Sequence, residues 1–367
     1  MRIRRPKKSV LTGAVAALGV CSVVLAFIAP GVEETKVDLN DGGVWVTNAK
    51  RGIVAHVNVP ARLMDAGLHA ASSTFDVFQN GEQVQLSDQV ANTLAPIDVT
   101  TATLTSAVDY RGMTTDVRGG TIAVTDAPNG KVWAQQADHP APINADDADA
   151  SISDVPGAVT TVDLEGNVHA VSAEAGRVTS LLKRGALTDT TTTPLTGVSA
   201  TDYLQIAAVG TDVVVWDQDT STLYLPGGKT QRIDGERVVL QDTGPKTNEV
   251  LLSSPNALIR VPIGGGTPTT TPAPAAGGSP TRPVAHNKCA YAAWSVTGAF
   301  VRDCPSDADD REMVVDSLAS AEKAIFRTNR DVIVLNDIEK DGLWLPDSEM
   351  ILVDNWDQLE SKLESEK

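Results

Sequence analysis

A short phrase that recurs about every forty residues limits the possible folds of this chain more than any other feature. Residues 44–48 read VWVTN and lead into a turn with Gly52, and residues 121–126 read TIAVTD and lead into a turn with Gly130. Each copy alternates apolar and other residues with a period of two, as a strand with one buried face requires. A polar strand end followed by a glycine is typical of a hairpin loop with one residue at positive φ.

The phrase occurs about eight times over roughly 290 residues, which indicates a β-propeller. A lone blade of three or four strands cannot bury its faces, so blades pack side by side in a closed ring. We predict an all-β propeller over residues 37–356 with eight blades, or seven if the first copy completes the last blade. Two stacked β-sandwiches are the alternative, but sandwiches do not repeat one phrase at constant spacing. The remaining copies lie at residues 83–88, 168–172, 213–217, 249–253, 289–304 and 332–336.

The amino terminus has the pattern of a membrane anchor. Residues 1–9 form a basic tail, and residues 10–29 carry no charge and are long enough to cross the hydrocarbon core as a helix. The positive cluster predicts that the amino terminus stays in the cytoplasm and that the propeller lies outside. A cleaved signal peptide is the alternative, but its apolar stretch is shorter and ends in a small-residue cleavage pattern, which is missing here. We therefore predict a single-pass protein of the cell membrane.

The net charge excludes one class of partner. The chain has 30 basic and 47 acidic residues, and all the charged residues that precede the apolar segment are basic. The rest of the chain keeps 25 basic against 47 acidic residues, a formal charge of −22. Such a surface repels nucleic acid, and no basic patch with interleaved aromatic residues offsets it. We therefore predict no nucleic-acid partner.

Two of the three cysteines are placed to form a disulfide. Cys21 lies within the apolar segment, whereas Cys289 and Cys304 lie in one predicted hairpin. In an oxidising exterior this pair can join neighbouring strands. Metal binding or redox catalysis is the alternative, but the chain has neither a C-x-x-C motif nor a histidine cluster near the pair.

Two segments have the composition of irregular structure. Residues 264–287 are rich in Gly, Pro, Thr and Ala, which predicts a flexible, exposed loop between two blades. Residues 357–367 are mostly charged, which predicts an acidic tail or the start of a linker, with a short helix at most. This ending favours a natural protein that continues beyond Lys367.

The search for chemistry finds one weak metal candidate. Asp337, Glu339 and Asp341 alternate before Gly342, and oxygen ligands at alternate positions near a glycine bend are typical of a calcium loop. The acidic residue that such a loop needs farther along is missing, so an ordinary hairpin turn is the preferred interpretation. No serine-hydrolase, zinc-protease or P-loop motif is present, and we predict no catalytic residue and no cofactor.

The tryptophans recur at equivalent positions of the repeat. Trp45 and Trp216 lie in the strand before the turn, and Trp133 and Trp344 lie in the strand after it. Recurrence of this kind is typical of packing between blades, so we prefer packing to a sugar-stacking or quinone-docking platform.

These residues resemble known sequences. The VWVTN phrase is similar to YVTN-type and quinoprotein-like propeller repeats. The basic-flanked anchor, the segment 41–48 (DGGVWVTN) and the pair CAYAAW (289–294) and RDC (302–304) together resemble the amino-terminal part of large actinobacterial surface proteins. In that family a membrane helix is followed by a propeller and then by fibronectin type III or other immunoglobulin-like modules. The resemblance carries over no catalytic residue.

The sequence thus favours a membrane-anchored, extracytoplasmic propeller that binds or scaffolds proteins or glycans of the cell envelope. The alternative is an enzyme or accessory module that degrades envelope polysaccharide by glycosyl-bond hydrolysis, which needs acidic and exposed aromatic residues at one channel mouth. A quinone-dependent dehydrogenase ranks third.

Overall fold

The computed structural model describes residues 42–145, 149–184 and 187–365. The predicted basic tail 1–9 and membrane helix 10–29 lie outside these described residues. Within the described ranges, no helix combines the length and the apolar character needed to cross a membrane. All described residues belong to one of the two units into which the chain divides.

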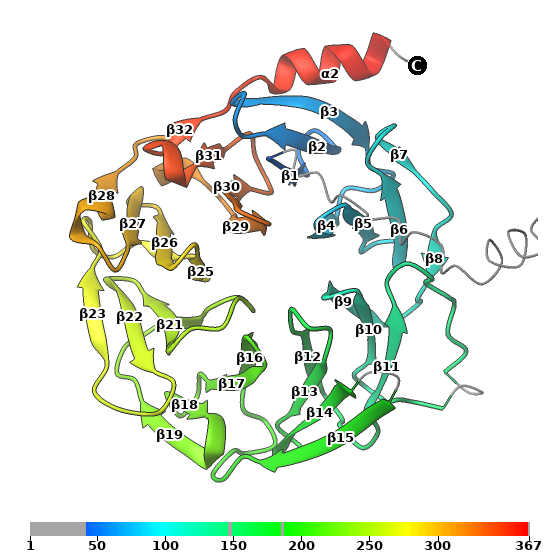
Figure 1. The fold of residues 1–367 in the computed structure, drawn as a ribbon, viewed down its shortest axis with the longest axis vertical. Helices are drawn as coiled ribbons and strands as arrows, with labels where there is room; N and C mark the ends of the chain where they lie inside the picture. The colour runs from blue at the N-terminus through cyan, green and yellow to red at the C-terminus, as the bar shows by residue number, and fades with distance from the viewer. Residues whose placement is uncertain (1–41, 146–148, 185–186, 366–367) are drawn as a thin grey trace, which may run out of the picture. The chain divides into compact units, whose positions relative to one another are not determined.

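Eight antiparallel sheets make up the described structure and stand side by side in a ring (Figure 1). The predicted all-β propeller with eight blades is therefore confirmed. The first copy of the phrase does not complete the last blade, because β1 (Gly43–Asn48) forms a sheet with the two strands that follow it.

The blades are numbered 1 to 8 in chain order. Blade 1 contains β1, β2 (Ile53–Asn58) and β3 (Leu63–His69); blade 2 contains β4 (Phe75–Asn80), β5 (Gln83–Asp88), β6 (Thr93–Asp98), β7 (Thr103–Leu104) and β8 (Val108–Asp109); blade 3 contains β9 (Thr114–Arg118), β10 (Thr121–Asp126) and β11 (Lys131–Gln136); blade 4 contains β12 (Val159–Val162), β13 (Val168–Ser172), β14 (Arg177–Arg184) and β15 (Leu187–Pro194).

Blades 5 to 8 follow in the same order. Blade 5 contains β16 (Leu204–Val209), β17 (Asp212–Asp217), β18 (Thr222–Leu225) and β19 (Lys229–Arg232); blade 6 contains β20 (Val239–Leu240), β21 (Glu249–Ser254), β22 (Ala257–Pro262) and β23 (Thr269–Pro272); blade 7 contains β24 (Ser279–Pro280), β25 (Val284–His286), β26 (Cys289–Ser295), β27 (Ala299–Asp303) and β28 (Arg311–Val314); blade 8 contains β29 (Ala324–Asn329), β30 (Val332–Asp337), β31 (Leu343–Leu345) and β32 (Ile351–Leu352).

Short helices lie between and after the strands. They are the 3-10 helices η1 (Pro226–Gly228), η2 (Asp307–Asp309), η3 (Leu318–Ser320) and η4 (Pro346–Ser348), and the α-helix α2 (Trp356–Ser365), which follows blade 8.

The recurring phrase has the same place in most blades. In blade 3 it forms β10, which pairs with the innermost strand β9 on one side and with β11 on the other. The glycines of the following turns have the predicted positive φ, 65° at Gly52 and 64° at Gly130, and Ser221 has φ 56° at the same place in blade 5. We call the face of the ring that carries these turns the turn face.

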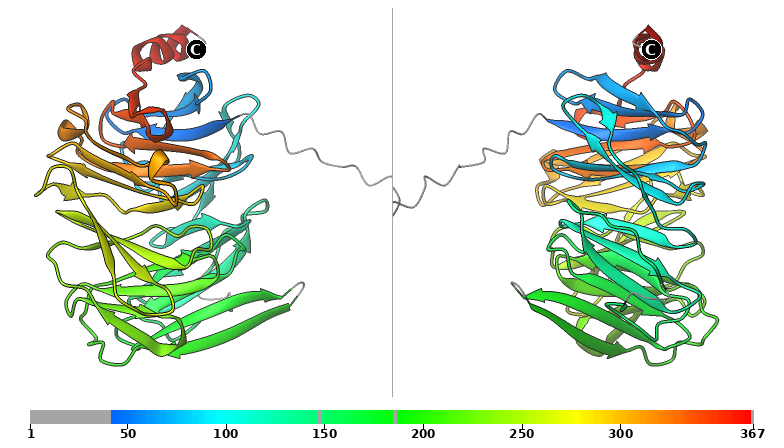
Figure 2. Two further views of the ribbon diagram at one scale, coloured as in Figure 1. Left: turned by 60° about the vertical axis from the view of Figure 1, so that its left-hand side comes forward. Right: turned by 90° about the vertical axis from the view of Figure 1, so that its right-hand side faces the viewer.

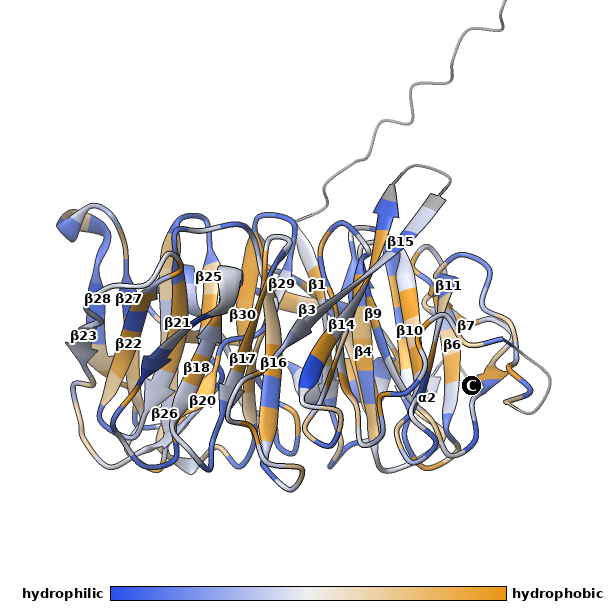
Figure 3. Ribbon diagram, turned by 90° about the horizontal axis from the view of Figure 1, so that it is seen from below, coloured by the Kyte–Doolittle hydropathy of each residue, from blue (hydrophilic) through white to orange (hydrophobic). Residues whose placement is uncertain are grey.

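Apolar side chains fill the space between neighbouring blades. Figure 3 shows hydrophobic residues along the strands and hydrophilic residues at the turns of both faces. Ile122 and Val124 pack on Leu94 of blade 2, while Ala123, on the other side of the same strand, packs on Val168 of blade 4. Every sheet is therefore covered on two faces. The longest strands, in the hairpin of β14 and β15, extend beyond the other blades (Figures 2 and 3).

The tryptophans confirm the packing interpretation. All six are buried, with exposed fractions between 0% and 4%. The predicted disulfide is also confirmed, since Cys289 at the start of β26 is bonded to Cys304 just after β27.

The prediction of a flexible loop over residues 264–287 is wrong in part, whereas the short helix allowed within residues 357–367 is present as part of α2. Within residues 264–287, β23 pairs with β22 as the outer strand of blade 6, and β24 pairs with β26. The β-branched threonines of this segment suit an outer strand that buries little apolar surface. Within residues 357–367, the described part continues α2, because Leu359 is buried together with Trp356 against blades 1 and 8.

The first strand of the ring lacks an inner neighbour among the described strands. Side-chain amides take the place of an inner strand along the free edge of β1. Gln79 accepts a hydrogen bond from the Trp45 N–H at 2.8 Å and donates to the Trp45 carbonyl at 3.1 Å. Asn336 of blade 8 bonds the N–H and carbonyl of Thr47 in the same way, at 3.1 and 3.0 Å. These bonds satisfy an edge that would otherwise be unpaired and tie the last blade to the first.

Candidate functional site

A cavity of about 720 Å³ lies on the inner side of blades 3 to 6 and is also lined by Arg282 of blade 7. Its walls come from strands β9, β12 and β16, which lie towards the centre of the ring in Figure 1, and from residues 242–243, which follow β20. Ala127 and Ala173, in turns of the turn face, also line it. The cavity therefore runs along the innermost strands and reaches the turn face.

The polar character of the cavity comes from the alternation of β9. Val117 is 8% exposed and packs in the apolar cluster shared with blade 2. Asp116 and Arg118 flank it in the strand, so their side chains leave the opposite side of the strand and line the cavity. An innermost strand thus places its polar residues in the cavity and its apolar residue in the core.

The carboxylates that line the cavity already have protein partners. Asp116 accepts a hydrogen bond from the Val162 N–H at 2.8 Å, which links blade 3 to blade 4. Asp202 accepts one from the Ser199 N–H at 2.6 Å. These bonds hold each carboxylate by one oxygen and fix its position.

The two arginines of the cavity differ in their surroundings. Arg282 lies 2.9 Å from a carboxylate oxygen of Asp242 and donates hydrogen bonds to the carbonyls of Leu240 and Gln241. Arg118, in contrast, has a buried Nε with no hydrogen-bond partner among the described residues. A buried donor without an acceptor is rare in folded proteins and calls for an explanation.

Hydroxyl groups form much of the remaining wall. The Thr161 and Thr243 hydroxyl oxygens lie 2.7 Å apart and join blade 4 to the segment that follows β20. Thr243 also accepts a hydrogen bond from the Ala208 N–H at 2.9 Å. Five threonines line the cavity in total: Thr114, Thr115, Thr160, Thr161 and Thr243.

One aromatic residue stands at the end of the cavity on the turn face. Tyr203 directly precedes β16 and is 63% exposed. Its backbone N–H donates to an Asp219 carboxylate oxygen at 2.6 Å, which fixes the main chain at this point. A large aromatic side chain that stays in solvent beside a polar cavity is available to a ligand.

The predicted calcium candidates do not converge on one point. Asp337 is buried, and its two oxygens accept hydrogen bonds from the N–H groups of Glu322, Lys323 and Glu339. These bonds make it a turn-capping residue, as the preferred interpretation of the sequence expected. Within the described ranges, no group of three or more His, Cys, Asp or Glu residues is arranged to hold a metal ion.

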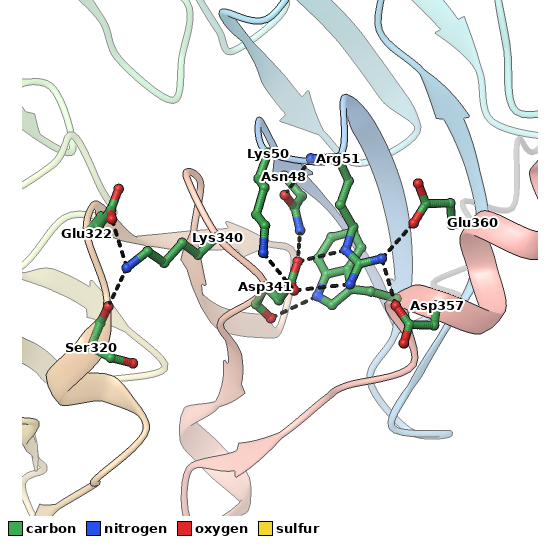
Figure 4. A network of polar contacts seen from close by, with 10 residues as sticks. Asn48, Lys50, Arg51, Ser320, Glu322, Lys340, Asp341, Asp357 and Glu360 are labelled. Atoms are coloured by element: carbon green, nitrogen blue, oxygen red, sulfur yellow. Dashed lines mark hydrogen bonds and ion pairs between the residues drawn. The ribbon is translucent and has the colours of Figure 1, made fainter.

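Asp341 instead belongs to an ionic network between blades 8 and 1 and α2 (Figure 4). Its oxygens lie 2.7 Å from Arg51 Nε and 2.7 Å from Asn48 Nδ2. The hydrogen bond from Arg51 lowers the pKa of Asp341, against the effect of its partial burial. Arg51 also contacts the carboxylates of Asp357 and Glu360 on α2, at 2.8 and 2.6 Å. The guanidinium group of Arg51 therefore takes the place beside Asp341 that a bound calcium ion would need.

Blade 4 contains a serine, a histidine and an aspartate in one hydrogen-bonded row. His169 Nδ1 lies 2.8 Å from Ser180 Oγ, and His169 Nε2 lies 3.2 Å from Asp163 Oδ2. His169 is 1% exposed and Asp163 is fully buried, so a substrate has no access to the row. The row holds neighbouring strands of the blade together.

Comparison with solved structures finds other propellers at low sequence identity. The chain is similar to dihydro-heme d1 dehydrogenase NirN in complex with DHE, with a TM-score of 0.58 and 10% identity over 89% of this chain and 75% of that chain. It is also similar to apo AztD from Citrobacter koseri, with a TM-score of 0.52 and 10% identity over 85% and 93% of the two chains. BamB from Moraxella catarrhalis gives a TM-score of 0.52 and 12% identity over 82% and 90%.

Identities this low support the fold alone. No protein-family model matches the chain, and neither does any curated protein.

Sequence reasoning did not find the cavity residues. Arg118 and Tyr203 belong to no motif, and each lies in a part of the repeat that varies from blade to blade. The period-two pattern of β9 gave the only available signal, because it placed two charged residues on one side of an innermost strand. It could not show that blades 4 to 7 supply the rest of the wall.

Proposed function

We propose that the protein is an extracytoplasmic binding or scaffolding module of the cell envelope, anchored by residues 10–29 with its amino terminus in the cytoplasm. The cavity carries the binding part of this proposal. It is built on innermost strands, which give a ligand site rigid walls, and its lining includes two arginines, three aspartates and five threonines. Its volume lies within the range of about 300–1,000 Å³ typical of ligand sites.

Two observations support a place outside the cytoplasm. A disulfide joins Cys289 to Cys304, and structural disulfides are characteristic of oxidising compartments. The charge of −22 beyond the apolar segment keeps such a domain soluble and away from anionic lipid surfaces.

The location is tested with the full chain in cells. We expect it in the membrane fraction after an alkaline carbonate wash, with the propeller cleaved by protease added to intact cells. A chain without residues 1–29 should leave the membrane fraction. Recovery of the full chain in the carbonate supernatant, or its protection in intact cells, contradicts the anchored, outward-facing arrangement.

The binding role is tested by affinity capture from solubilised envelope with residues 37–367. Val159 lines the cavity and is 44% exposed, so Val159→Trp should narrow the cavity without disturbing the core. We expect capture of specific envelope components by the unchanged protein, at least tenfold less capture by Val159→Trp, and no change with the matched control Val90→Trp at a surface position that is 63% exposed. Release of reducing sugars from envelope glycan by the pure protein would instead favour the hydrolase alternative.

A further inference from the structure

We propose that the central cavity binds a neutral oligosaccharide, with Arg118 donating hydrogen bonds to sugar oxygens and Tyr203 packing on a sugar ring. The inference rests on the proposed function, because it names the ligand class of the same cavity. Four properties of the cavity lead to it: an unpartnered donor, the balance of charges, the hydroxyl lining and an exposed aromatic residue.

The first property is the unpartnered donor of Arg118. Arg327, a buried arginine elsewhere in the ring, has several protein partners. Arg327, which is 7% exposed, donates to Asn336 Oδ1 at 2.9 Å and to Thr47 Oγ1 at 2.8 Å, and it also pairs with Asp76. Arg118 Nε is buried like these groups but has no acceptor in the described protein. Arg118 also lines the cavity, so the rest of its guanidinium group can donate hydrogen bonds to a ligand oxygen there.

The second property is the balance of charges, which disfavours an anion. Asp116, Asp202 and Asp242 line the cavity together with two arginines, one of which is paired with Asp242. The charged groups that line the cavity therefore sum to −1, and the domain as a whole is strongly acidic. The acidic domain and the net negative lining both repel a carboxylate or phosphate, so an uncharged oxygen is the better acceptor for the cavity-lining Arg118.

The third property is the mixed set of donors and acceptors. Gln205 uses its Oε1 to accept from the Leu240 N–H at 2.9 Å, which leaves its amide hydrogens for a ligand. The threonine hydroxyls can both donate and accept hydrogen bonds, and the free oxygens of Asp116 and Asp202 can accept them. A ligand that is rich in hydroxyl groups, each both donor and acceptor, matches such a lining better than a peptide, which has one donor and one acceptor per residue.

The fourth property is Tyr203 at the turn face. Among the large apolar and aromatic side chains that are exposed in the described ranges, Tyr203 is the aromatic one. The C–H faces of a sugar ring are apolar and pack on an aromatic ring, while the phenol oxygen remains free for a hydrogen bond. Tyr203 therefore completes a site with a polar interior and an aromatic edge.

The experiment measures binding of neutral trisaccharides built from glucose, mannose, galactose or N-acetylglucosamine to residues 37–367 by isothermal titration calorimetry. Glucuronate serves as the carboxylate probe, and a neutral capped peptide serves as the peptide probe. We expect at least one neutral trisaccharide to bind with Kd below 1 mM, and Arg118→Gln and Tyr203→Ala each to raise that Kd at least tenfold. Arg232→Gln is the control, because Arg232 is 73% exposed on the outer strand β19.

Several outcomes would overturn the inference. They are the failure of every neutral trisaccharide to bind, binding that is unchanged in both cavity variants, or Arg118-dependent binding of glucuronate or the peptide in place of the sugars. Circular dichroism checks that each variant folds, and Arg118→Lys replaces Arg118→Gln if the latter does not. Loss of sugar binding together with retained, Val159-sensitive capture of envelope components would reject the ligand class while leaving the proposed binding function intact.

Discussion

Asp163 shows how a single buried carboxylate organises a turn of this fold. It is fully buried between β12 and β13 and accepts hydrogen bonds from the Asn167 N–H at 2.9 Å, from Asn167 Nδ2 at 2.7 Å and from His169. Burial alone would raise the pKa of Asp163. The hydrogen bonds from His169 and Asn167 outweigh burial and hold this pKa below its ordinary value.

The lowered pKa of Asp163 makes its contribution to stability depend on pH. A carboxyl group with a lower pKa in the folded state stabilises the fold above its unfolded pKa of about 4, and this stabilisation is lost as pH falls through the folded pKa. We expect Asp163→Asn to reduce the free energy of unfolding by about 1–3 kcal/mol at pH 7. As pH falls from 4 to 2, the free energy of unfolding of this variant should decrease less than that of the unchanged protein. Urea unfolding at pH 7, 4 and 2 measures both quantities.

Asp234 provides the matched control for this prediction. Its side chain is 93% exposed and pairs only with the exposed Arg232. Asp234→Asn should therefore change the free energy of unfolding by less than about 0.5 kcal/mol at each pH. An Asp163→Asn variant that keeps the full pH dependence of the unchanged protein would show that Asp163 is not responsible.

At the scale of elements, α2 is the part that departs furthest from the repeat. Trp356 is 1% exposed within the cluster of blades 1 and 8, and its indole N–H donates to the Asp341 carbonyl at 2.9 Å. Asn355, just before the helix, bonds both the N–H and the carbonyl of Met64 on β3, each at 2.9 Å. Because α2 follows blade 8 and packs on blade 1, it acts as a clasp across the seam of the ring.

Removal of the clasp's apolar anchor tests this role. We expect Trp356→Ala to reduce the free energy of unfolding by about 3–5 kcal/mol, the usual cost of removing a buried aromatic side chain. Glu364→Ala, at an exposed position of the same helix, should change it by less than about 0.5 kcal/mol. Chemical unfolding followed by circular dichroism provides the measurement, and equal effects of the two changes would show that α2 is not part of the closure.

At the scale of the whole molecule, closure of the ring makes the stability of distant segments depend on each other. Blade 8 shares one apolar cluster with blade 1 and α2 and another with blade 7. The Ala49 N–H also donates to the Ile338 carbonyl at 2.8 Å, across the seam. Blade 1 is therefore supported by residues almost 300 positions away in the chain.

Deletion of the last blade is expected to destabilise the entire ring. A chain that ends at residue 323 exposes the apolar faces of blades 1 and 7 at once, and it should aggregate or lose its cooperative thermal transition. A chain that ends at residue 365 removes nothing that is described and should unfold like the full unit. Size-exclusion chromatography and calorimetry distinguish these results, and a shortened chain that stays monomeric with a cooperative transition would contradict a closed, mutually supported ring.

The sequence by itself determined the repeat, the disulfide and the packing role of the tryptophans, and it favoured eight blades over seven. These features depend on local rules: period-two alternation, glycine at positive φ and the redox preference of paired cysteines. It misjudged segment 264–287, because strand β23 is held by its neighbour β22 rather than by its own composition. The threonines of β23 pair with β22, and Trp356, Leu359 and Leu363 of α2 pack in the apolar cluster of blades 1 and 8.

Only the tertiary structure decided how the ring is closed and where a ligand would bind. The amides of Gln79 and Asn336 replace an inner strand of blade 1, although nothing in their local sequence marks them. Arg118 became a candidate because it lines a cavity to which blades 3 to 7 all contribute residues. Periodicity fixes which side of a strand a residue occupies, but the partners on that side come from other blades, and their distances exist only after the ring has formed.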